Sequence, residues 1–350
     1  LPFVSMWAVA FSTFVFLSSS LLRLPTAATD SPTVLTASAP NQSAWSHLGR
    51  FLDAPRGGRV PGISQLKSYF RRFGYLPPLP SRPPDDTFDA ELQAAVAAYQ
   101  RRLSLPLTGR LDRHTLASIL SPRCGVPDVP PPAASRRFAY FSGRPRWGRR
   151  APITLTYAFS ARHPAPGLRA RDVRAAFRRA FRRWSAVIPV KFREAARYGG
   201  ADIRIGFYHG AHGDGEPFDG ELGVLAHAFS PENGGFHMDA AERWATDLGG
   251  GGAAAAAVDL ESVATHEIGH ILGLGHSSVR RAVMYPSLRP GTRKVGLQVD
   301  DVDGVQALYG SNPNFKSSTL TRSAAARPLL GVAFRSLLAF SLAFRALRIF

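Results

Sequence analysis

Three histidines and one glutamate lie within eleven residues and could together hold and use a metal ion. The stretch reads His-Glu-Ile-Gly-His-Ile-Leu-Gly-Leu-Gly-His and carries His266, Glu267, His270 and His276. Residues four apart share one face of a helix, so His266 and His270 can direct their rings at one ion. Gly273 permits a turn that ends the helix and returns His276 as a third nitrogen ligand. Three protein ligands with one open position are typical of a catalytic zinc site.

Glu267 follows the first of these ligands and can reach a metal-bound water without binding the metal itself. A bound zinc lowers the pKa of its water to about 7. The pattern therefore predicts hydrolysis, with Glu267 as the general base that accepts the proton of the attacking water and then delivers it to the leaving group.

The only cysteine of the chain, Cys124, lies in the segment Pro122-Arg123-Cys124-Gly125-Val126-Pro127-Asp128. Two prolines hold this segment extended, and Gly125 allows a close backbone approach. A thiolate is a strong zinc ligand. Cys124 could thus occupy the open coordination position and exclude water, whereas the alternative is an inert buried thiol.

This heptapeptide, the zinc motif and Met284, eight residues after His276, resemble the matrix metalloproteinases, the matrixins of the metzincin clan. The plant branch, which lacks a hemopexin-like domain, is the most similar. The resemblance covers about residues 46–312. It implies a secreted zinc endopeptidase made as a latent zymogen, with Cys124 as the latency switch. It also implies that Met284 forms an apolar floor under the zinc ligands and that Arg123 pairs with a carboxylate.

A second set of metal-ligating residues lies at 212–242. Its members are His212, Asp214, His227 and His237. Three imidazoles and one carboxylate make a closed tetrahedral set that suits a structural zinc. Their placement matches the structural zinc site of the matrixins. The resemblance also implies calcium, a cation that takes oxygen ligands. The calcium ligands that it implies are Asp219, the Gly220 carbonyl, Asp239 and Glu242, with Asp202 in a second calcium site.

Substrate is expected to lie extended along the edge strand Val224 to Phe229, with Leu225 and Ala226 as binding residues. Ser262 lies four residues before His266, on the same helix face, and is predicted to line the adjacent pocket. A residue as small as serine would leave that pocket deep. Residues 287–298 would form the specificity loop.

The predicted fold class is α+β: a metzincin catalytic domain at 136–312, with a mixed twisted sheet and three helices. Strands are expected at 153–159, 190–193 and 203–207, and an amphipathic helix carries Val173 to Trp184 with a solvated arginine face. A further helix runs from near Asp259 to Leu272, and the last covers 300–310. A small all-α prodomain at 46–121 precedes them. Within it, Phe88 to Leu120 resembles peptidoglycan-binding-like prodomains.

The remaining segments are read from composition. Residues 1–28 resemble a signal peptide, with a retained membrane anchor as the alternative, and 122–135 form the cysteine-switch segment and linker. At 313–350 a polar spacer precedes an apolar tail, which is either a GPI-anchor signal or an amphipathic or disordered tail. The expected localisation is the extracellular matrix or cell wall, or the plasma membrane through a GPI anchor.

The net charge of +18 permits binding to anionic polymers. No arginine run is interleaved with aromatics, so nucleic-acid binding is not expected. The expected partners are protein or peptide substrates and an activating protease, and the chain is expected to be a monomer. The rival hypothesis is a zinc-stabilised module that binds cell-wall glycans through residues 46–121.

Overall fold

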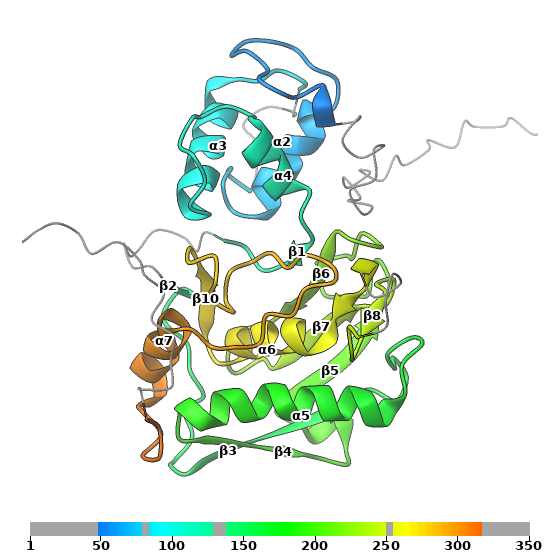
Figure 1. Ribbon diagram of the computed structural model, residues 1–350, viewed down its shortest axis with the longest axis vertical. Coiled ribbons are helices and arrows are strands. Elements are labelled where there is room, and N and C mark those ends of the chain that lie inside the picture. Colours follow the sequence, from blue (N-terminus) through cyan, green and yellow to red (C-terminus); the bar gives the residue numbers. More distant parts are fainter. Residues whose placement is uncertain (1–47, 79–82, 84, 129–137, 250–254, 317–350) are drawn as a thin grey trace, which may run out of the picture. The chain divides into compact units, whose positions relative to one another are not determined.

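The computed structural model describes residues 48–78, 83, 85–128, 138–249 and 255–316, which all belong to one compact unit (Figure 1). The predicted signal peptide, most of the linker after Asp128 and the C-terminal tail therefore lie outside the described residues. Within the described part of the chain, no helix is both long and apolar enough to cross a membrane.

The first described region is helical. Its helices are α2 (Ile63–Arg72), α3 (Ala90–Arg102) and α4 (Arg113–Ile119). Asp89 caps α3 by accepting a hydrogen bond from the backbone N–H of Leu92 at 2.8 Å, and Asp112 caps α4 through Thr115 at the same distance. Apolar residues at helical spacing meet in one core, which includes Leu66, Phe70, Leu92, Val96, Tyr99 and Leu116.

The second region is built on a six-stranded sheet of order β1-β6-β7-β5-β3-β4. The strands are β1 (Arg123–Cys124), β3 (Ile153–Phe159), β4 (Val190–Glu194), β5 (Ile203–Tyr208), β6 (Val224–Ala228) and β7 (Gly235–Asp239). Neighbours run parallel except β6 and β7, so the sheet is mixed. The three strands predicted from alternation correspond to β3, β4 and β5.

The outer edge of β6 is covered by β1. Arg123 lies opposite Val224, and Cys124 lies opposite Ala226. The backbone N–H of Gly125 donates to the Ala226 carbonyl at 2.8 Å. A side chain at position 125 would meet Val224 at 2.7 Å, which explains why this close approach needs glycine. The predicted substrate edge is thus already paired with the cysteine segment.

Two small sheets flank the main one: β2 (Phe138–Tyr140) pairs antiparallel with β10 (Leu274–Ser277), and β8 (Trp244–Ala245) pairs parallel with β9 (Val258–Asp259). The helices of this region are α5 (Ala170–Val187), α6 (Leu260–Ile271) and α7 (Val299–Tyr309), besides a short 3₁₀ turn, η1 (Tyr198–Gly200). α5 and α6 lie side by side (Figure 1), and the Trp184 indole N–H donates to the Thr265 carbonyl at 2.9 Å. The α+β fold class predicted from the sequence is confirmed.

The arginine face of α5 corrects one expectation, because it is not simply solvated. Arg179 and Arg183 contact Glu261 on α6 at 2.5 and 2.6 Å, and Glu261 is fully buried. Arg293, from the loop after β10, contacts the same carboxylate at 2.5 Å. Three guanidinium groups therefore neutralise one buried acid and hold α5, α6 and that loop together.

Candidate metal centre and active site

α6 and β10 bring the three histidines of the motif to one point. The Nε2 atom of His270 lies 3.1 Å from that of His266 and 3.3 Å from that of His276. Gly273 takes a φ of +100° between the two elements, and a side chain there would meet the Pro145 carbonyl oxygen at 2.2 Å. A tetrahedral ion with metal–nitrogen distances of about 2.0–2.1 Å separates its ligands by about 3.4 Å, so the spacing suits zinc.

The opposite nitrogen of each ring is fixed by a hydrogen bond. Burial lowers the pKa of all three imidazoles, that of His276 to about 4, so the rings are neutral near pH 7. Each Nδ1–H then donates to an acceptor, which leaves the Nε2 lone pair facing the common point. The acceptors are the Val283 carbonyl for His266, the Leu274 carbonyl for His270 and the Asp128 carboxylate for His276, at 2.7, 2.7 and 2.8 Å.

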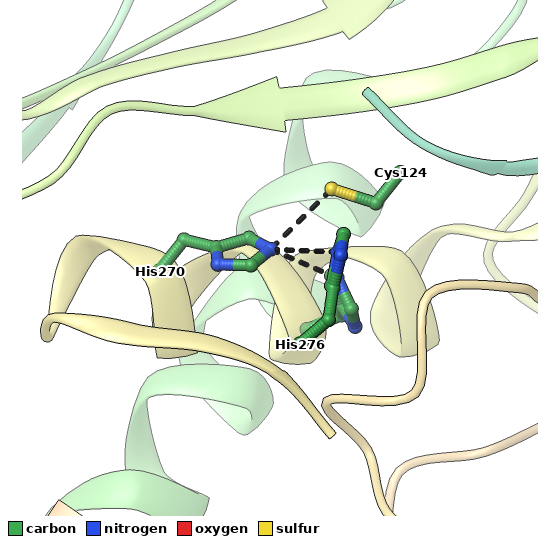
Figure 2. A group of neighbouring side chains, drawn as sticks. Cys124, His270 and His276 are labelled. Atoms are coloured by element: carbon green, nitrogen blue, oxygen red, sulfur yellow. Dashed lines mark hydrogen bonds between the residues drawn. The ribbon is translucent and has the colours of Figure 1, made fainter. Parts of the chain in front are cut away.

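Cys124 supplies a fourth donor atom. Its Sγ lies 3.4 Å from His270 Nε2, and Figure 2 shows the thiol directed at the histidine rings. The ligand atoms of Cys124, His266, His270 and His276 all lie within 4.8 Å of one another, and all four residues are buried. Burial raises the pKa of the thiol, whereas a metal ligand must be a thiolate. Three imidazole nitrogens and one sulfur are the donor set of a tetrahedral zinc site, so the residues fit this ion.

Glu267 is fully buried, and neither of its carboxylate oxygens accepts a hydrogen bond from any described residue. Burial raises its pKa to about 8. A buried carboxylate without a partner is costly. Glu267 lies beside the Cys124 thiol and helps to raise the pKa of that thiol. A water that replaced the thiol would therefore lie next to the Glu267 carboxylate.

The carboxylate partner of Arg123, which the sequence left unidentified, is Asp128. Arg123 Nη2 lies 2.5 Å from Asp128 Oδ1, and both side chains are buried. The guanidinium also stacks on the Phe73 ring at 3.5 Å. Burial opposes ionisation of Asp128, but Arg123 and the hydrogen bond from His276 hold its pKa well below the usual range. The switch segment therefore contacts a proposed zinc ligand through Asp128 as well as through Cys124.

Met284 is buried directly under α6. A side chain at Gly269 would meet the Met284 sulfur at 2.2 Å, so the glycine inside the zinc motif makes room for this residue. Asp301 of α7 accepts hydrogen bonds from the backbone N–H groups of Val283 and Met284 at 2.9 and 3.0 Å. The sequence pattern predicted the helix at 300–310 but not this support for the turn that carries Met284.

The second predicted zinc set also converges. Asp214 Oδ2 lies 2.8 Å from His212 Nε2, 2.8 Å from His227 Nε2 and 2.7 Å from His237 Nδ1. His212 Nε2 and His227 Nε2 lie 3.1 and 3.3 Å from His237 Nδ1. These four ligand atoms form one compact group. Their number, type and spacing fit a closed tetrahedral zinc.

The predicted calcium ligands come from the loop before β6 (Asp219), the end of β7 (Asp239) and the turn that follows β7 (Glu242). Gly220 N–H donates to Asp239 Oδ2 at 3.3 Å, and Leu222 N–H donates to Glu242 Oε1 at 2.7 Å. The other Glu242 oxygen is buried without a partner among the described residues. Burial and the neighbouring carboxylates raise the pKa of Asp239 to about 6 and that of Glu242 to about 8. This acidic cluster has the donors and the unmet charge that suit a calcium ion.

Asp202 does not join this cluster. It precedes β5, whereas Asp239 pairs with Tyr208 at the other end of that strand, about 20 Å away at 3.3 Å per residue. Its carboxylate pairs with Arg149 and accepts hydrogen bonds from the Thr156 backbone and hydroxyl at 2.7 and 2.8 Å. These contacts pair the Asp202 carboxylate within the protein, and the second calcium site stays a prediction.

The pocket next to the zinc site is small in this structure, where Cys124 forms part of its wall, and the deep pocket expected from Ser262 stays a prediction. The cavity has a volume of about 20 Å³, room for about one water molecule. Ser262 and Leu225 line it as predicted, whereas Ala226 contributes its backbone to pairing with the cysteine segment. Ser262 Oγ accepts a hydrogen bond from the Lys294 N–H at 2.7 Å, so the loop, rather than empty space, lies against the small residue.

Comparison with known proteins gives two family matches and a set of relatives. The matrixin model matches residues 146–310, and a putative peptidoglycan binding domain matches residues 59–119. Metalloendoproteinase 1-MMP of Arabidopsis thaliana is 52% identical over 81% of this chain and 78% of its own length. Metalloendoproteinase 4-MMP of the same plant is 53% identical over 75% and 76%. Neutrophil collagenase of Homo sapiens is 36% identical over 74% of this chain and 52% of its own length.

Proposed function

The chain belongs to the matrixin family and is a zinc metalloendopeptidase, and we propose that it is made as a latent zymogen whose catalytic zinc is closed by Cys124. The observation that carries the proposal is the convergence of the Cys124 sulfur with His266, His270 and His276 in one buried group. A thiolate at the fourth position leaves no room there for water. Release of the segment around Cys124 would open it.

His266, His270 and His276 would hold the catalytic zinc, which would supply a Lewis acid for the hydrolysis of a peptide bond. Glu267 would accept the proton of the attacking water and deliver it to the leaving amine. Its burial and its lack of hydrogen-bond donors raise its pKa, so the ionised carboxylate would be a stronger base than an exposed one. An extended substrate would pair with β6, whose edge β1 occupies in the latent chain.

The other metal sites are part of the same proposal. His212, Asp214, His227 and His237 would hold a structural zinc. The acidic cluster of Asp219, Asp239 and Glu242, with the Gly220 carbonyl, would hold one calcium ion that neutralises it. Both sites would tie the loop between β5 and β6 to the sheet and so support β6, against which the substrate would lie.

We further propose that the protein acts outside the cell, as a monomer, on matrix, cell-wall or surface proteins. An activating protease would cut the proline-rich connection between Pro132 and Tyr140. The Leu329–Phe350 stretch is proposed as a GPI-anchor signal. These proposals rest on the sequence and on the resemblance to plant metalloendoproteinases.

The central test compares the uncut chain with the chain cut in the 129–137 connection, on a quenched-peptide library. The cut chain should cleave peptides, and the uncut chain should be nearly silent. Glu267→Ala in the cut chain should lower kcat/KM by about 10²–10⁴-fold while the zinc content stays at the wild-type level. Turnover retained by the Glu267→Ala variant would contradict the mechanism.

A second candidate function follows from the match of residues 59–119 to a putative peptidoglycan binding domain. In that case α2, α3 and α4 would attach the protein to cell-wall glycans. The test is sedimentation of the uncut chain with purified cell walls. The chain carries Glu267→Ala to prevent self-cleavage, so the result does not depend on peptidase activity.

A further inference from the structure

Lys294 lies in the wall of the cavity that borders Glu267, and it is the only lysine or arginine among the described residues that line this cavity. The cavity also contacts Leu225 of β6 and His266, so it joins the proposed substrate edge to the proposed zinc site. The Nζ atom of Lys294 donates to the carbonyl oxygens of Tyr285 and Ser287 at 3.2 and 3.3 Å.

The fold fixes the place of this ammonium group. The Lys294 backbone N–H donates to Ser262 Oγ at 2.7 Å. The preceding residue, Arg293, contacts Asp259 at 3.3 Å and Glu261 at 2.5 Å. Both anchors lie at the start of α6, two turns before Glu267 on the same helix. Because α6 also carries the proposed catalytic base, the loop with Lys294 is anchored to the same helix as Glu267.

The charge of Lys294 has no direct acidic partner. No carboxylate among the described residues forms an ion pair with it; Asp301 acts on it only at longer range, and the Tyr285 ring lies 5.4 Å from Nζ. The two carbonyl contacts are at the long end of N–H···O distances. An ammonium has three donors, so one donor of Lys294 stays available. A partly buried ammonium with an unused donor attracts an anionic group that enters the cavity and can hydrogen-bond to it.

Lys294 also borders a second, larger space. Four residues, Tyr285, Ser287, Leu288 and Lys294, line both this cavity and a groove of about 760 Å³. Lys294 is therefore part of the wall that the two spaces share. On the side of the active site, Cys124 forms part of the wall, so departure of the cysteine segment would open the entrance to substrate.

A peptide extended along β6 with its scissile carbonyl beside Glu267 turns alternate side chains to opposite faces. One of those next to the cut bond would enter this cavity once Cys124 has left its wall and widened it. We propose that Lys294 is a specificity-determining residue that selects substrates with an acidic side chain, glutamate above all, at the residue immediately after the bond that is cut. The inference rests on the proposed peptidase function of the same site.

The test uses the full chain, activated by cutting the 129–137 connection, and three peptides that differ only in having Glu, Gln or Leu after the cut bond. Glutamate and glutamine have nearly the same shape, so their ratio of kcat/KM isolates the charge. We expect the wild type to prefer Glu over Gln by on the order of tenfold or more, the scale of a hydrogen bond to a charged group.

Lys294→Met keeps the length of the side chain and removes its charge. It should bring the Glu-to-Gln ratio close to one while the Leu peptide is cleaved at least as fast as by the wild type. Lys294→Arg keeps the charge and should retain a preference for Glu. Lys191→Met, on the exposed surface of β4, is the matched control and should leave all three rates unchanged.

A wild-type ratio near one, or a Lys294→Met variant that still prefers Glu, overturns the inference and leaves the proposed peptidase function intact. If the activated wild type cleaves none of the library peptides, the proposed function itself fails. Should Lys294→Met not fold, as judged by zinc content and circular dichroism, the wild-type ratio and the Lys294→Arg variant decide the question.

Discussion

At the scale of single residues, the proposed latency depends on the chemistry of one sulfur atom. A serine hydroxyl has nearly the size of the thiol but is not deprotonated near pH 7, so it is a much poorer zinc ligand. The uncut Cys124→Ser chain should therefore cleave a quenched peptide at least tenfold faster than the uncut wild type. The measurement is the initial rate, with Glu267→Ala as the blank.

Ser121→Ala is the control for Cys124→Ser. Ser121 lies three residues before the cysteine, and its hydroxyl donates to the Ala117 carbonyl within the helical region. It should leave the uncut chain silent. An uncut Cys124→Ser chain as silent as this control would count against the proposed switch.

The local pattern was sufficient to predict the residues that share an element or a motif. His266, Glu267 and His270 follow from helical spacing, and the turn at Gly273 follows from the glycine. The acceptor for His276 did not follow, because Asp128 lies 148 residues away along the chain. Lys294 was missed for the same reason: its role arises from a loop that folds back onto Ser262. Contacts of this kind depend on tertiary packing and leave no periodic signal.

At the scale of elements, the buried Glu261 joins α5, α6 and the loop that carries Arg293. Glu261→Gln would keep the shape but remove the charge that three guanidinium groups share. Those groups are partly exposed, so solvent reduces the loss. We expect the free energy of unfolding to fall by on the order of 2–3 kcal/mol. The measurement is urea denaturation with and without Glu261→Gln, in a protein that also carries Glu267→Ala.

The control for Glu261 is Asp172 at the start of α5, which pairs with Arg169 and Arg171, two largely exposed arginines. Asp172→Asn should change the unfolding free energy by no more than about 0.5 kcal/mol. Equal effects of the two variants would show that the buried acid contributes no more than a surface ion pair.

The acidic cluster predicts a pH dependence. The pKa values of Asp239 and Glu242 in the folded, calcium-free protein are raised to about 6 and about 8. In the unfolded chain a carboxyl group has a pKa near 4. Between these pH values the folded protein therefore binds protons that the unfolded chain has already released. Stability without calcium therefore falls as pH rises from about 4.5 to about 8. Calcium replaces these protons, so its stabilising effect should grow over the same window.

The measurement is the difference in Tm between samples with calcium and with the calcium chelator EGTA, at pH 5, 6.5 and 8. The difference should be largest at pH 8. Asp239→Asn removes one ligand charge and should reduce the difference at every pH. A calcium effect that is the same at all three pH values, or absent, would argue against the calcium site.

The elements themselves were largely predictable. Alternation located β3, β4 and β5, and the helical period located α5. The contacts of Asp259 at the start of α6 were not predictable. Its side chain makes no capping hydrogen bond to the backbone. It accepts a hydrogen bond from the Ser262 hydroxyl at 3.1 Å and pairs with Arg293. A capping residue is recognised by type, but the sequence does not show that a distant arginine competes for it.

At the scale of the whole molecule, the helical region contacts the walls of the active site at several points. The Tyr285 hydroxyl, from the pocket wall, donates to the Leu103 carbonyl at 3.2 Å. The Ser104 hydroxyl donates to the Ser278 carbonyl at 3.0 Å. Tyr285 is buried in the same apolar cluster as the helices. The closed state therefore depends on the end of α3 as well as on Cys124.

Arg102 offers the sharpest test of that dependence. Its guanidinium, at the end of α3, donates to the backbone carbonyl of His276, a proposed zinc ligand. Arg102→Ala removes this contact and should loosen the prodomain without touching the zinc, the base or the cysteine. One hydrogen bond is worth about 1 kcal/mol, so the residual peptide cleavage by the uncut chain should rise roughly fivefold.

The neighbouring Arg101 is exposed and provides the matched control, since Arg101→Ala removes the same charge from the same helix end. After the 129–137 connection is cut and the prodomain has been removed, wild type and both variants should show equal kcat/KM, because both arginines leave with it. A faster uncut Arg102→Ala chain together with equal activated enzymes assigns the effect to latency. Uncut rates that are equal for Arg101→Ala and Arg102→Ala would show that the cysteine segment alone keeps the enzyme closed.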